Sequence, residues 1–336
     1  MGAKLRGVSA PIKVLVTGAS GMLGRGVAEA LLARGDEVTV LQRRPSGLDT
    51  REVLGDIAEA GVVRHAAAGA AAVIHLAAKV DVVGRWAEYD HANVEGTRAV
   101  VEACQDAGVR RLVNVSSPSV AHTGRSLVGV GAERANPDRA RGNYARSKAL
   151  AEQVALAADS ENLTVVSVRP HLVWGPGDTQ LVGRIIARAR AGRLPIIATG
   201  AALIDTTYVD NAVDALLAAL TADVHGEALV VSNGEPRPVG EVLRLLCEAA
   251  GVAAPSRHVP FGVALSAGAI VEGVWKVLDR RDTPPLTRFL AEQLATAHWF
   301  DQRHTREALD WTPRVTLDAG FAALTKHYRE AQRLGA

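Results

Sequence analysis

The feature that most constrains this chain is a glycine-rich turn between an apolar strand and a helix near the N-terminus. Residues 12–16 form an apolar, β-branched run, and residues 22–32 carry apolar side chains at helical spacing. The turn between them places Gly18, Gly21 and Gly24 three residues apart. A strand, turn and helix of this kind point backbone N–H groups and the positive end of the helix at a pyrophosphate. An ordinary tight turn is the alternative, but the strand before and the helix after favour a dinucleotide site.

Strand and helix patterns alternate through the first half of the chain. Apolar runs typical of buried strands occur at 37–41, around 53, and at 72–76, 111–115 and 164–168. Because helical patterns separate these runs, we expect a parallel sheet with helices on both faces. The predicted fold class is a Rossmann-type, doubly wound α/β fold with a smaller mixed substrate-binding region. We also expect one long helix over 87–107 and a loop over 118–143.

The pattern becomes irregular after Arg169 and Pro170. We therefore place the dinucleotide-binding core at residues 1–170 and a mixed α/β substrate-binding region at residues 171–336. The boundary is soft, because an apolar run near Val230 can return to the main sheet.

Composition narrows the class of partner and the compartment. With 4% aromatic residues and a net charge of +2, the chain lacks the features of a nucleic-acid-binding surface. Cys104 and Cys247 have no metal-binding spacing, so we expect buried thiols, a reducing compartment and no metal. Residues 1–11 lack the apolar core of a signal peptide, and charges interrupt the apolar stretch 261–278. That stretch suits a helix that touches a membrane or an apolar substrate better than a membrane span. We expect a cytoplasmic protein.

The end of the second strand predicts the cofactor. Enzymes that select NAD usually place an acidic residue there to accept from the ribose 2′-OH, but this chain has Gln42, followed by Arg43 and Arg44. Two guanidinium groups suit a 2′-phosphate, so we expect NADPH, with a solvated basic turn as the alternative. Asp56, after the third strand, is a candidate for the adenine amino group or for a helix N-cap.

A tyrosine and a lysine four residues apart are the candidate catalytic pair. Tyr144 and Lys148 would share one face of a helix, where a neighbouring cation lowers the pKa of a phenol. The spacing alone is weak evidence. Ser117 strengthens it, because a hydroxyl at the carboxyl end of a strand can donate to the same carbonyl oxygen. Its alternative role is turn formation ahead of Pro118.

These residues together resemble the extended branch of the short-chain dehydrogenase/reductase superfamily. The matching motifs occur in the family's order at 17–24, 55–57, 75–78, 93–97, 115–120, 144–148 and 169–178. The resemblance implies that Ser117, Tyr144 and Lys148 are catalytic, with Asn93 near the proton relay. It also implies cofactor contacts, beyond those above, at Ser20, Met22, Leu23, Ile57, Ala77, Ala78, Lys79, Pro170, His171 and Val173.

Within that branch the chain is similar to the 3β-hydroxysteroid dehydrogenase group, and more so to bacterial 2-alkyl-3-oxoalkanoate reductases of olefin and β-lactone pathways. The segments that carry this similarity are 116–122, 169–182, 203–212, 232–236 and 285–299. The resemblance implies NADPH-dependent reduction of a 2-alkyl-3-oxoalkanoic acid to the 3-hydroxy acid, with Tyr144 as proton donor. The alternatives are a 3β-hydroxysteroid or decarboxylating sterol-4α-carboxylate 3-dehydrogenase, a nucleotide-sugar epimerase or dehydratase, and a non-catalytic NADP-binding regulator.

The substrate contacts are less well defined than the cofactor contacts. Pro118 and His122 are candidates, although His122 stands where the family often has a Tyr-Gly pair and could equally be a surface loop residue. Arg146, Arg184 and His122 are candidate partners for a substrate carboxylate. We also expect a homodimer, and peripheral association with a membrane or with pathway enzymes is compatible with the apolar stretch.

Overall fold

A seven-stranded parallel sheet forms the centre of the protein in this computed structural model, which describes residues 11–81, 84–122, 124–278, 284 and 286–334. Its strands lie in the order β12 (Glu227–Val231), β7 (Thr164–Pro170), β5 (Arg111–Val115), β4 (Ala72–His75), β1 (Lys13–Thr17), β2 (Glu37–Gln42) and β3 (Arg51–Leu54). Strand order reverses between β1 and β4, which is the switch point where open α/β sheets bind ligands. The predicted Rossmann-type fold is confirmed.

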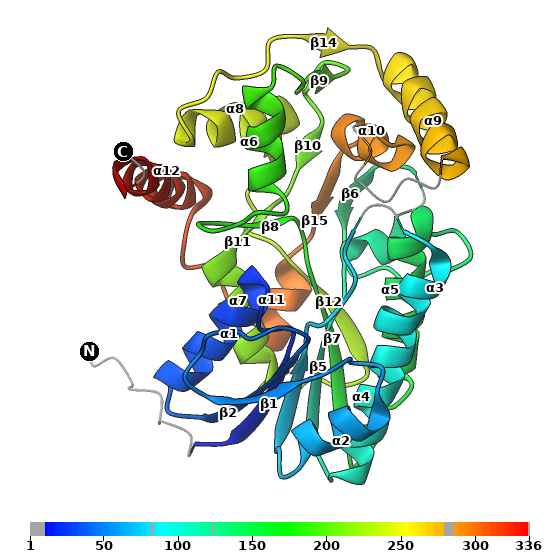
Figure 1. Cartoon of the computed structure of the whole chain (residues 1–336), viewed down its shortest axis with the longest axis vertical. Coiled ribbons are helices and arrows are strands. Elements are labelled where there is room, and N and C mark those ends of the chain that lie inside the picture. The colour runs from blue at the N-terminus through cyan, green and yellow to red at the C-terminus, as the bar shows by residue number, and fades with distance from the viewer. Residues whose placement is uncertain (1–10, 82–83, 123, 279–283, 285, 335–336) are drawn as a thin grey trace.

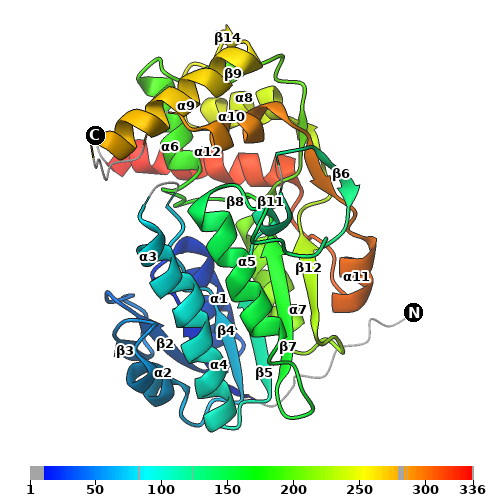
Figure 2. The same ribbon diagram turned by 90° about the vertical axis from the view of Figure 1, so that its right-hand side faces the viewer.

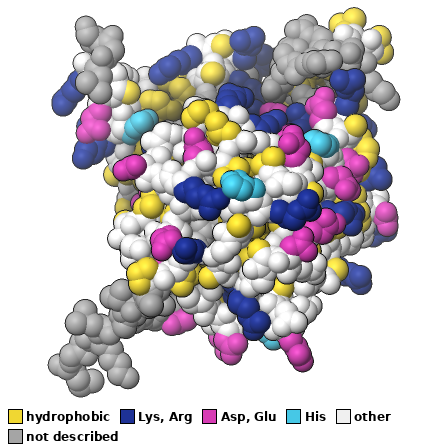
Figure 3. All heavy atoms as spheres, turned by 60° about the horizontal axis from the view of Figure 1, so that its bottom comes forward, with side chains coloured by type: hydrophobic (Ala, Val, Ile, Leu, Met, Phe, Trp, Pro, Cys, Tyr) yellow, Lys and Arg dark blue, Asp and Glu magenta, His cyan; other side chains and the backbone are white. Residues whose placement is uncertain are grey.

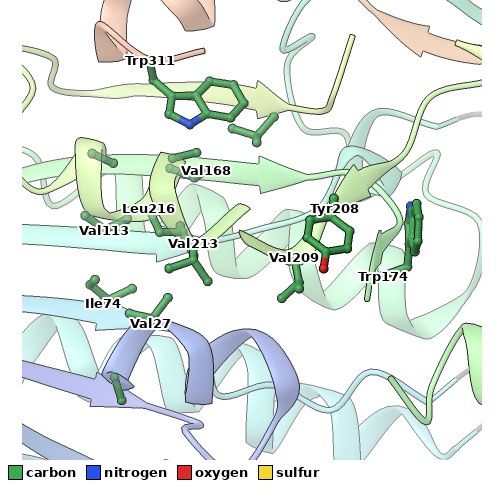
Figure 4. Close-up of a cluster of buried hydrophobic side chains, with 14 of the residues drawn as sticks. Val27, Ile74, Val113, Val168, Trp174, Tyr208, Val209, Val213, Leu216 and Trp311 are labelled. Atoms are coloured by element: carbon green, nitrogen blue, oxygen red, sulfur yellow. The ribbon is translucent and has the colours of Figure 1, made fainter. Parts of the chain in front are cut away.

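Helices cover both faces of this sheet (Figure 1). One face carries α1 (Met22–Ala33) and α7 (Val209–Ala219), and the other carries α2 (Ala60–Ala67), α4 (Gly96–Asp106) and α5 (Gly142–Leu156). Successive β1 side chains enter opposite cores, because side chains alternate across a strand: Val14 and Val16 in one, Leu15 in the other. Figure 4 shows the first of these cores, where Val27 lies near Ile74. Both cysteines are buried, as predicted.

A smaller lobe sits beyond the carboxyl ends of the strands (Figures 1 and 2). Its helices are α6 (Val182–Arg190), α8 (Val239–Ala249), α9 (Phe261–Val277), α10 (Arg288–Ala295) and α12 (Leu317–Leu334), while α11 (Arg303–Leu309) lies nearer the main sheet. A small mixed sheet joins β13 (Arg237–Pro238), β10 (Leu203–Ile204), β15 (His298–Phe300) and β6 (Leu127–Val130). Two further pairs are β11 (Thr207–Tyr208) with β8 (Val173–Trp174), and β14 (His258–Val259) with β9 (Ile196–Ile197).

Two predicted segments differ in the structure. The single helix expected over 87–107 is α3 (Trp86–Tyr89), a π-helical turn (Asp90–Glu95) and then α4. The loop expected over 118–143 contains a 3₁₀ turn and β6, which pairs with β15 from the last part of the chain. Periodicity does not reveal either feature, because a single π turn is too short to alter the apolar pattern visibly and a four-residue strand depends on its distant partner.

The distribution of surface charge and the character of the helices bear on whether the protein could bind nucleic acid or cross a membrane. Basic and acidic side chains are interspersed on the face seen in Figure 3, with no broad area of one sign. Within the described residues, no helix combines the length and apolar character needed to cross a membrane.

Candidate active site

The glycine turn is shaped by close backbone contacts. Gly18 has a φ of +81°, and a Cβ atom there would lie 2.8 Å from the Ala77 nitrogen. A Cβ atom on Gly24 would lie 2.4 Å from the Gly18 carbonyl oxygen, whereas one on Gly21 would make an ordinary contact at 3.6 Å. Only glycine therefore fits at the first and third positions, since the turn and the start of α1 approach each other too closely for a side chain.

The backbone N–H groups in the first turn of α1 have no side-chain cap, because the N-cap position is a glycine. Gly21 is the N-cap residue, and no side chain caps the helix there. The first N–H groups of a helix carry partial positive charge and need acceptors. Gly18, Gly21, Met22 and Leu23 line a cavity of about 580 Å³. The turn therefore fits the pyrophosphate of a dinucleotide cofactor.

The end of β2 lies beside this turn, because the Gly18 N–H donates to the Leu41 carbonyl oxygen at 2.9 Å. Gln42 is buried, and its amide donates to Glu52 at 2.6 Å. Arg43 and Arg44 are exposed immediately after it.

Asp56 follows β3 at the same edge of the sheet. Its carboxylate accepts from the Ala58 N–H at 2.9 Å and lies 3.3 Å from the His91 ring. It stabilises a turn, whereas Glu59 occupies the N-cap position of α2. The predicted N-cap role of Asp56 is therefore wrong, because the chain makes one more turn between Asp56 and the start of α2. Ile57 is buried next to it.

Ser117, Tyr144 and Lys148 meet at the carboxyl end of β5. Ser117 caps the 3₁₀ turn at Pro118–Ala121, so its predicted turn-forming role is also present. Its Oγ accepts from the Ser119 N–H at 3.3 Å and contacts the Ser119 hydroxyl at 3.0 Å. Tyr144 lies in the first turn of α5, and Lys148 one turn later donates from Nζ to the Val115 carbonyl oxygen at 2.6 Å.

The pKa of Tyr144 differs from the prediction. Burial raises it above the ordinary value of 10, and the hydrogen bond with Ser117 opposes that rise. Burial also lowers the pKa of Lys148 to about 8, while Glu152 opposes that change. The predicted lowering of the phenol's pKa by the ammonium is thus wrong for this chain, because desolvation is the largest effect on both groups.

Asn93 lies in the π-helical turn that interrupts the expected long helix. Its side-chain amide donates to the Lys79 carbonyl at 3.1 Å and to the Ser147 hydroxyl at 2.8 Å, and its Oδ1 accepts from the Lys79 N–H at 2.7 Å. Asn93 therefore joins the segment after β4 to the helix that carries Tyr144. Single π turns of this kind are often found at functional sites.

The segment after β7 forms another wall of the site. Pro170 ends the strand, and Leu172 has a φ of +43°, which turns the chain sharply before β8. The adjacent Arg169 is buried with Glu152 in a two-point ion pair, with its Nε donating at 2.8 Å. This pair anchors α5 to the end of the sheet.

Most predicted contact residues line the cavity described above. They are Gly18, Gly21, Met22, Leu23, Gly24, Ala78, Ser117, Pro118, His122, Tyr144, Lys148, Pro170, His171 and Val173. Others lie outside its lining, namely Ser20, Arg43, Arg44, Asp56, Ile57, Ala77, Lys79 and Asn93. His122 is buried and not a surface loop residue.

The far wall of the cavity was not predicted from the sequence. It is mainly apolar and comes from the smaller lobe: Leu243, Leu246, Phe289, Leu290, Leu294 and Phe300. His298, on the unpredicted strand β15, also lines it. The sequence does show leucines at helical spacing and the distinctive segment 285–299. Neither feature indicates which face of a helix points to the site. Within the described residues, no cluster of three or more His, Cys, Asp or Glu side chains is placed to hold a metal ion.

Comparison with known proteins agrees with this geometry. The NAD dependent epimerase/dehydratase family matches residues 14–232. The chain is 40% identical to the 2-alkyl-3-oxoalkanoate reductase of Stenotrophomonas maltophilia, over 93% of this chain and 98% of that protein. It is 30% identical to the human decarboxylating sterol-4-alpha-carboxylate 3-dehydrogenase, over 95% of this chain and 89% of that protein.

The architecture is shared with solved structures. The structure of MoeE5 with UDP-glucuronic acid and NAD superimposes with a TM-score of 0.73 at 27% identity, covering 95% of this chain and 99% of that one. With its Rossmann-type sheet, glycine turn and matched family, this chain belongs to the NAD dependent epimerase/dehydratase family, the extended branch of the short-chain dehydrogenase/reductases.

Proposed function

We propose that this protein is an NADPH-dependent reductase that converts a 2-alkyl-3-oxoalkanoic acid into the 3-hydroxy acid. The observation that carries this proposal is the position of Ser117 and Tyr144 in the wall of one cavity, between the glycine turn and an apolar lobe. The 40% identity to a 2-alkyl-3-oxoalkanoate reductase along nearly the full length supports the substrate class.

The two hydroxyl groups are suited to act on a ketone oxygen. Burial raises the pKa of Tyr144, so the phenol keeps its proton at neutral pH and can give it to that oxygen. The Ser117 oxygen already accepts from the Ser119 N–H, which leaves its own proton available for the same oxygen. When bound, the nicotinamide supplies the hydride that reaches the ketone carbon.

Lys148 has two roles in this proposal. It lies one helical turn from Tyr144, and its ammonium donates to the Val115 carbonyl at the end of the strand that leads to Ser117. Lys148 thereby holds α5 against that strand, and its remaining N–H groups can donate to the cofactor ribose.

The far wall suits long alkyl chains. Leu243 and Leu246 of α8, together with Leu290 and Leu294 of α10, present an apolar surface to the cavity. An alkyl chain bound there leaves water, which contributes about 0.8 kcal/mol for each buried CH₂ group. A nucleotide sugar would find few partners on this wall, which favours the reductase over an epimerase.

We propose NADPH over NADH because Arg43 and Arg44 stand exposed beside the glycine turn. Removing both arginines (R43A/R44A) should raise the KM for NADPH at least tenfold and leave the KM for NADH within about twofold, since only NADPH carries the 2′-phosphate. The exposed Arg244, which pairs with Glu248 on α8, provides the control variant R244A. An unchanged preference between the two cofactors would refute this assignment.

The reaction is tested by Tyr144→Phe with NADPH and a freshly prepared 2-alkyl-3-oxo acid. We expect kcat to fall about 10²- to 10⁴-fold, the usual contribution of a positioned acid, with NADPH affinity kept. Tyr328→Phe, on α12 outside the cavity lining, is the matched control. Turnover that survives in Y144F at near the original rate would exclude Tyr144 as the proton donor.

A sterol substrate is the second candidate, because the 30% identity to a sterol-4-alpha-carboxylate 3-dehydrogenase extends over most of both chains. Assays of the same preparation with a 3-keto-4-carboxysterol and with NADP⁺ plus the 3-hydroxy sterol acid distinguish the two. A kcat/KM for the sterol above that for the 2-alkyl-3-oxo acid would replace the proposed substrate. Sedimentation and cell fractionation test the accompanying predictions of a cytoplasmic homodimer.

A further inference from the structure

Three histidines from distant parts of the chain gather at one end of the cavity. His122 follows the 3₁₀ turn that Ser117 caps, His171 follows β7, and His298 lies on β15. All three are at least 94% buried and all line the cavity that contains Tyr144. The rings of His171 and His298 meet edge to face at 4.9 Å between centroids.

These imidazoles retain unused hydrogen-bonding atoms. Neither ring nitrogen of His122 has a partner within the described residues, and the same is true of Nδ1 in His171 and in His298. His298 donates from Nε2 to the Gln293 carbonyl oxygen at 2.8 Å, and the rings of His122 and Phe289 lie nearly perpendicular, with 6.2 Å between centroids. A buried polar group without a partner is costly, so His122 is suited to a ligand that accepts a hydrogen bond.

The charge of the cluster indicates which ligand fits. Burial, helped by His298 and Arg141, lowers the pKa of His122 to about 4, and burial also lowers the pKa values of His171 and His298. All three rings are therefore neutral at pH 7. Neutral His122 can donate its one N–H to a ligand, whereas His298 already donates its N–H to the Gln293 carbonyl oxygen, and an anion placed beside these rings would favour a protonated ring.

Charged groups from several elements surround His122 and His171. Arg141, ahead of α5, faces His122 but is paired with Glu292 of α10 at 3.6 Å between Arg141 Nη2 and Glu292 Oε1. The backbone of Asp205, beside β10, is hydrogen-bonded to His171, and the Asp205 carboxylate itself accepts from Ser232. Arg184 and Arg188 of α6 line the same cavity: Arg184 lies 3.8 Å from the Asp81 carboxylate, and Arg188 donates to the Pro284 carbonyl oxygen at 3.5 Å. By contrast, neither nitrogen of the His122 ring has a partner within the described residues.

We infer that His122, flanked by His298, is the binding site for the carboxylate of the acid substrate, and that binding takes up one proton from solvent. This inference rests on the proposed function, because it assigns the acid group of that substrate. The chemistry is consistent with the substrate's shape, since the carboxyl carbon is two bonds from the ketone carbon that Ser117 and Tyr144 would hold. His122 and Ser117 share one short segment of chain, so both ends of this three-carbon unit would be met by residues 117–122.

The first test compares an acid with its uncharged analogue. The stable 2-alkyl-3-hydroxy acid and its methyl ester are oxidised with NADP⁺ by the wild-type protein, by His122→Phe and by His122→Gln, whose amide keeps an N–H donor. We expect His122→Phe to lower the acid-to-ester ratio of kcat/KM about 10- to 100-fold, mainly through KM for the acid. His122→Gln should recover part of that loss. His225→Gln, an exposed imidazole paired with Asp159, is the control for histidine removal.

The second test measures proton uptake without turnover. The hydroxy acid is titrated calorimetrically at pH 7 into NADPH-loaded protein, a pair that cannot react, in buffers of different ionisation enthalpy. We expect uptake of close to one proton in the wild type and close to none in His122→Gln.

The outcomes separate the two proposals. If the wild-type protein oxidises neither acid nor ester, the proposed function fails, and the calorimetric uptake still decides the role of His122. If acid and ester are both oxidised but their ratio is the same in wild type and His122→Phe, the carboxylate site is wrong. A loss of acid preference in Arg184→Gln, with none in the His122 variants, would likewise overturn it in favour of the arginine on α6.

Discussion

Lys148 should make the stability of this protein depend on pH in a way that a single substitution removes. Its pKa is about 8 in the folded chain and 10.5 ordinarily. Below pH 8 both states carry the proton, and the folded state holds a buried charge that the unfolded state leaves in water. Between pH 8 and 10.5 the unfolded chain binds more protons, so stability rises with pH. Integrated over that interval, the gap corresponds to about 3 kcal/mol.

The assay compares the wild type with Lys148→Met in urea unfolding at intervals from pH 7 to 10.5. Loss of the hydrogen bond to the Val115 carbonyl lowers the variant's stability by a similar amount at each pH, whereas the charge contributes only in the wild type. The difference in unfolding free energy, wild type minus variant, should therefore rise by about 3 kcal/mol across this range. Lys326→Met, at an exposed lysine on α12, should show no such rise. A constant difference for Lys148→Met would refute the buried-charge interpretation.

Two further substitutions test the backbone and the ion pair that shape the site. Gly24→Ala places a methyl group 2.4 Å from the Gly18 carbonyl oxygen. We therefore expect the free energy of unfolding in urea to fall by about 1–3 kcal/mol, and NADPH to bind more weakly in a fluorescence titration. Wild-type values for both quantities would contradict the predicted clash. Glu152→Gln leaves Arg169 buried without its counter-charge and should cost about 3–5 kcal/mol. The control Glu248→Gln, at an exposed ion pair, should lower the free energy of unfolding by less than about 1 kcal/mol. Equal losses in Glu152→Gln and Glu248→Gln would show that burial does not control the effect.

The parts of the site that sequence predicted are those set by short-range geometry. The glycine turn was recognisable because Gly18 and Gly24 lie on consecutive local elements whose close approach excludes a Cβ atom. Tyr144 and Lys148 were predicted to share a helix face because four residues make about one turn. The alternation of strands and helices likewise predicted the parallel sheet.

The spacing of residues along the chain does not predict structure that depends on a distant strand or on an irregular helical turn. β6 depends on pairing with β15, so neither strand was expected, and His298 was missed with it. The apolar pattern predicts continuous helix where the structure has the π-helical turn that holds Asn93 against Lys79 and Ser147, because one extra residue in a turn leaves little trace in that pattern.

By itself, then, the sequence determined the family, the glycine turn and the shared helix position of Tyr144 and Lys148, because each follows from short motifs within the chain. Only the tertiary structure decided their ionisation and their surroundings. The pKa values of Tyr144 and Lys148 follow from burial, which spacing does not reveal. The gathering of His122, His171 and His298 likewise exists only once three separate segments pack around one cavity. The burial of a side chain and its distance from other groups depend on how the whole chain packs, so no local motif predicts them.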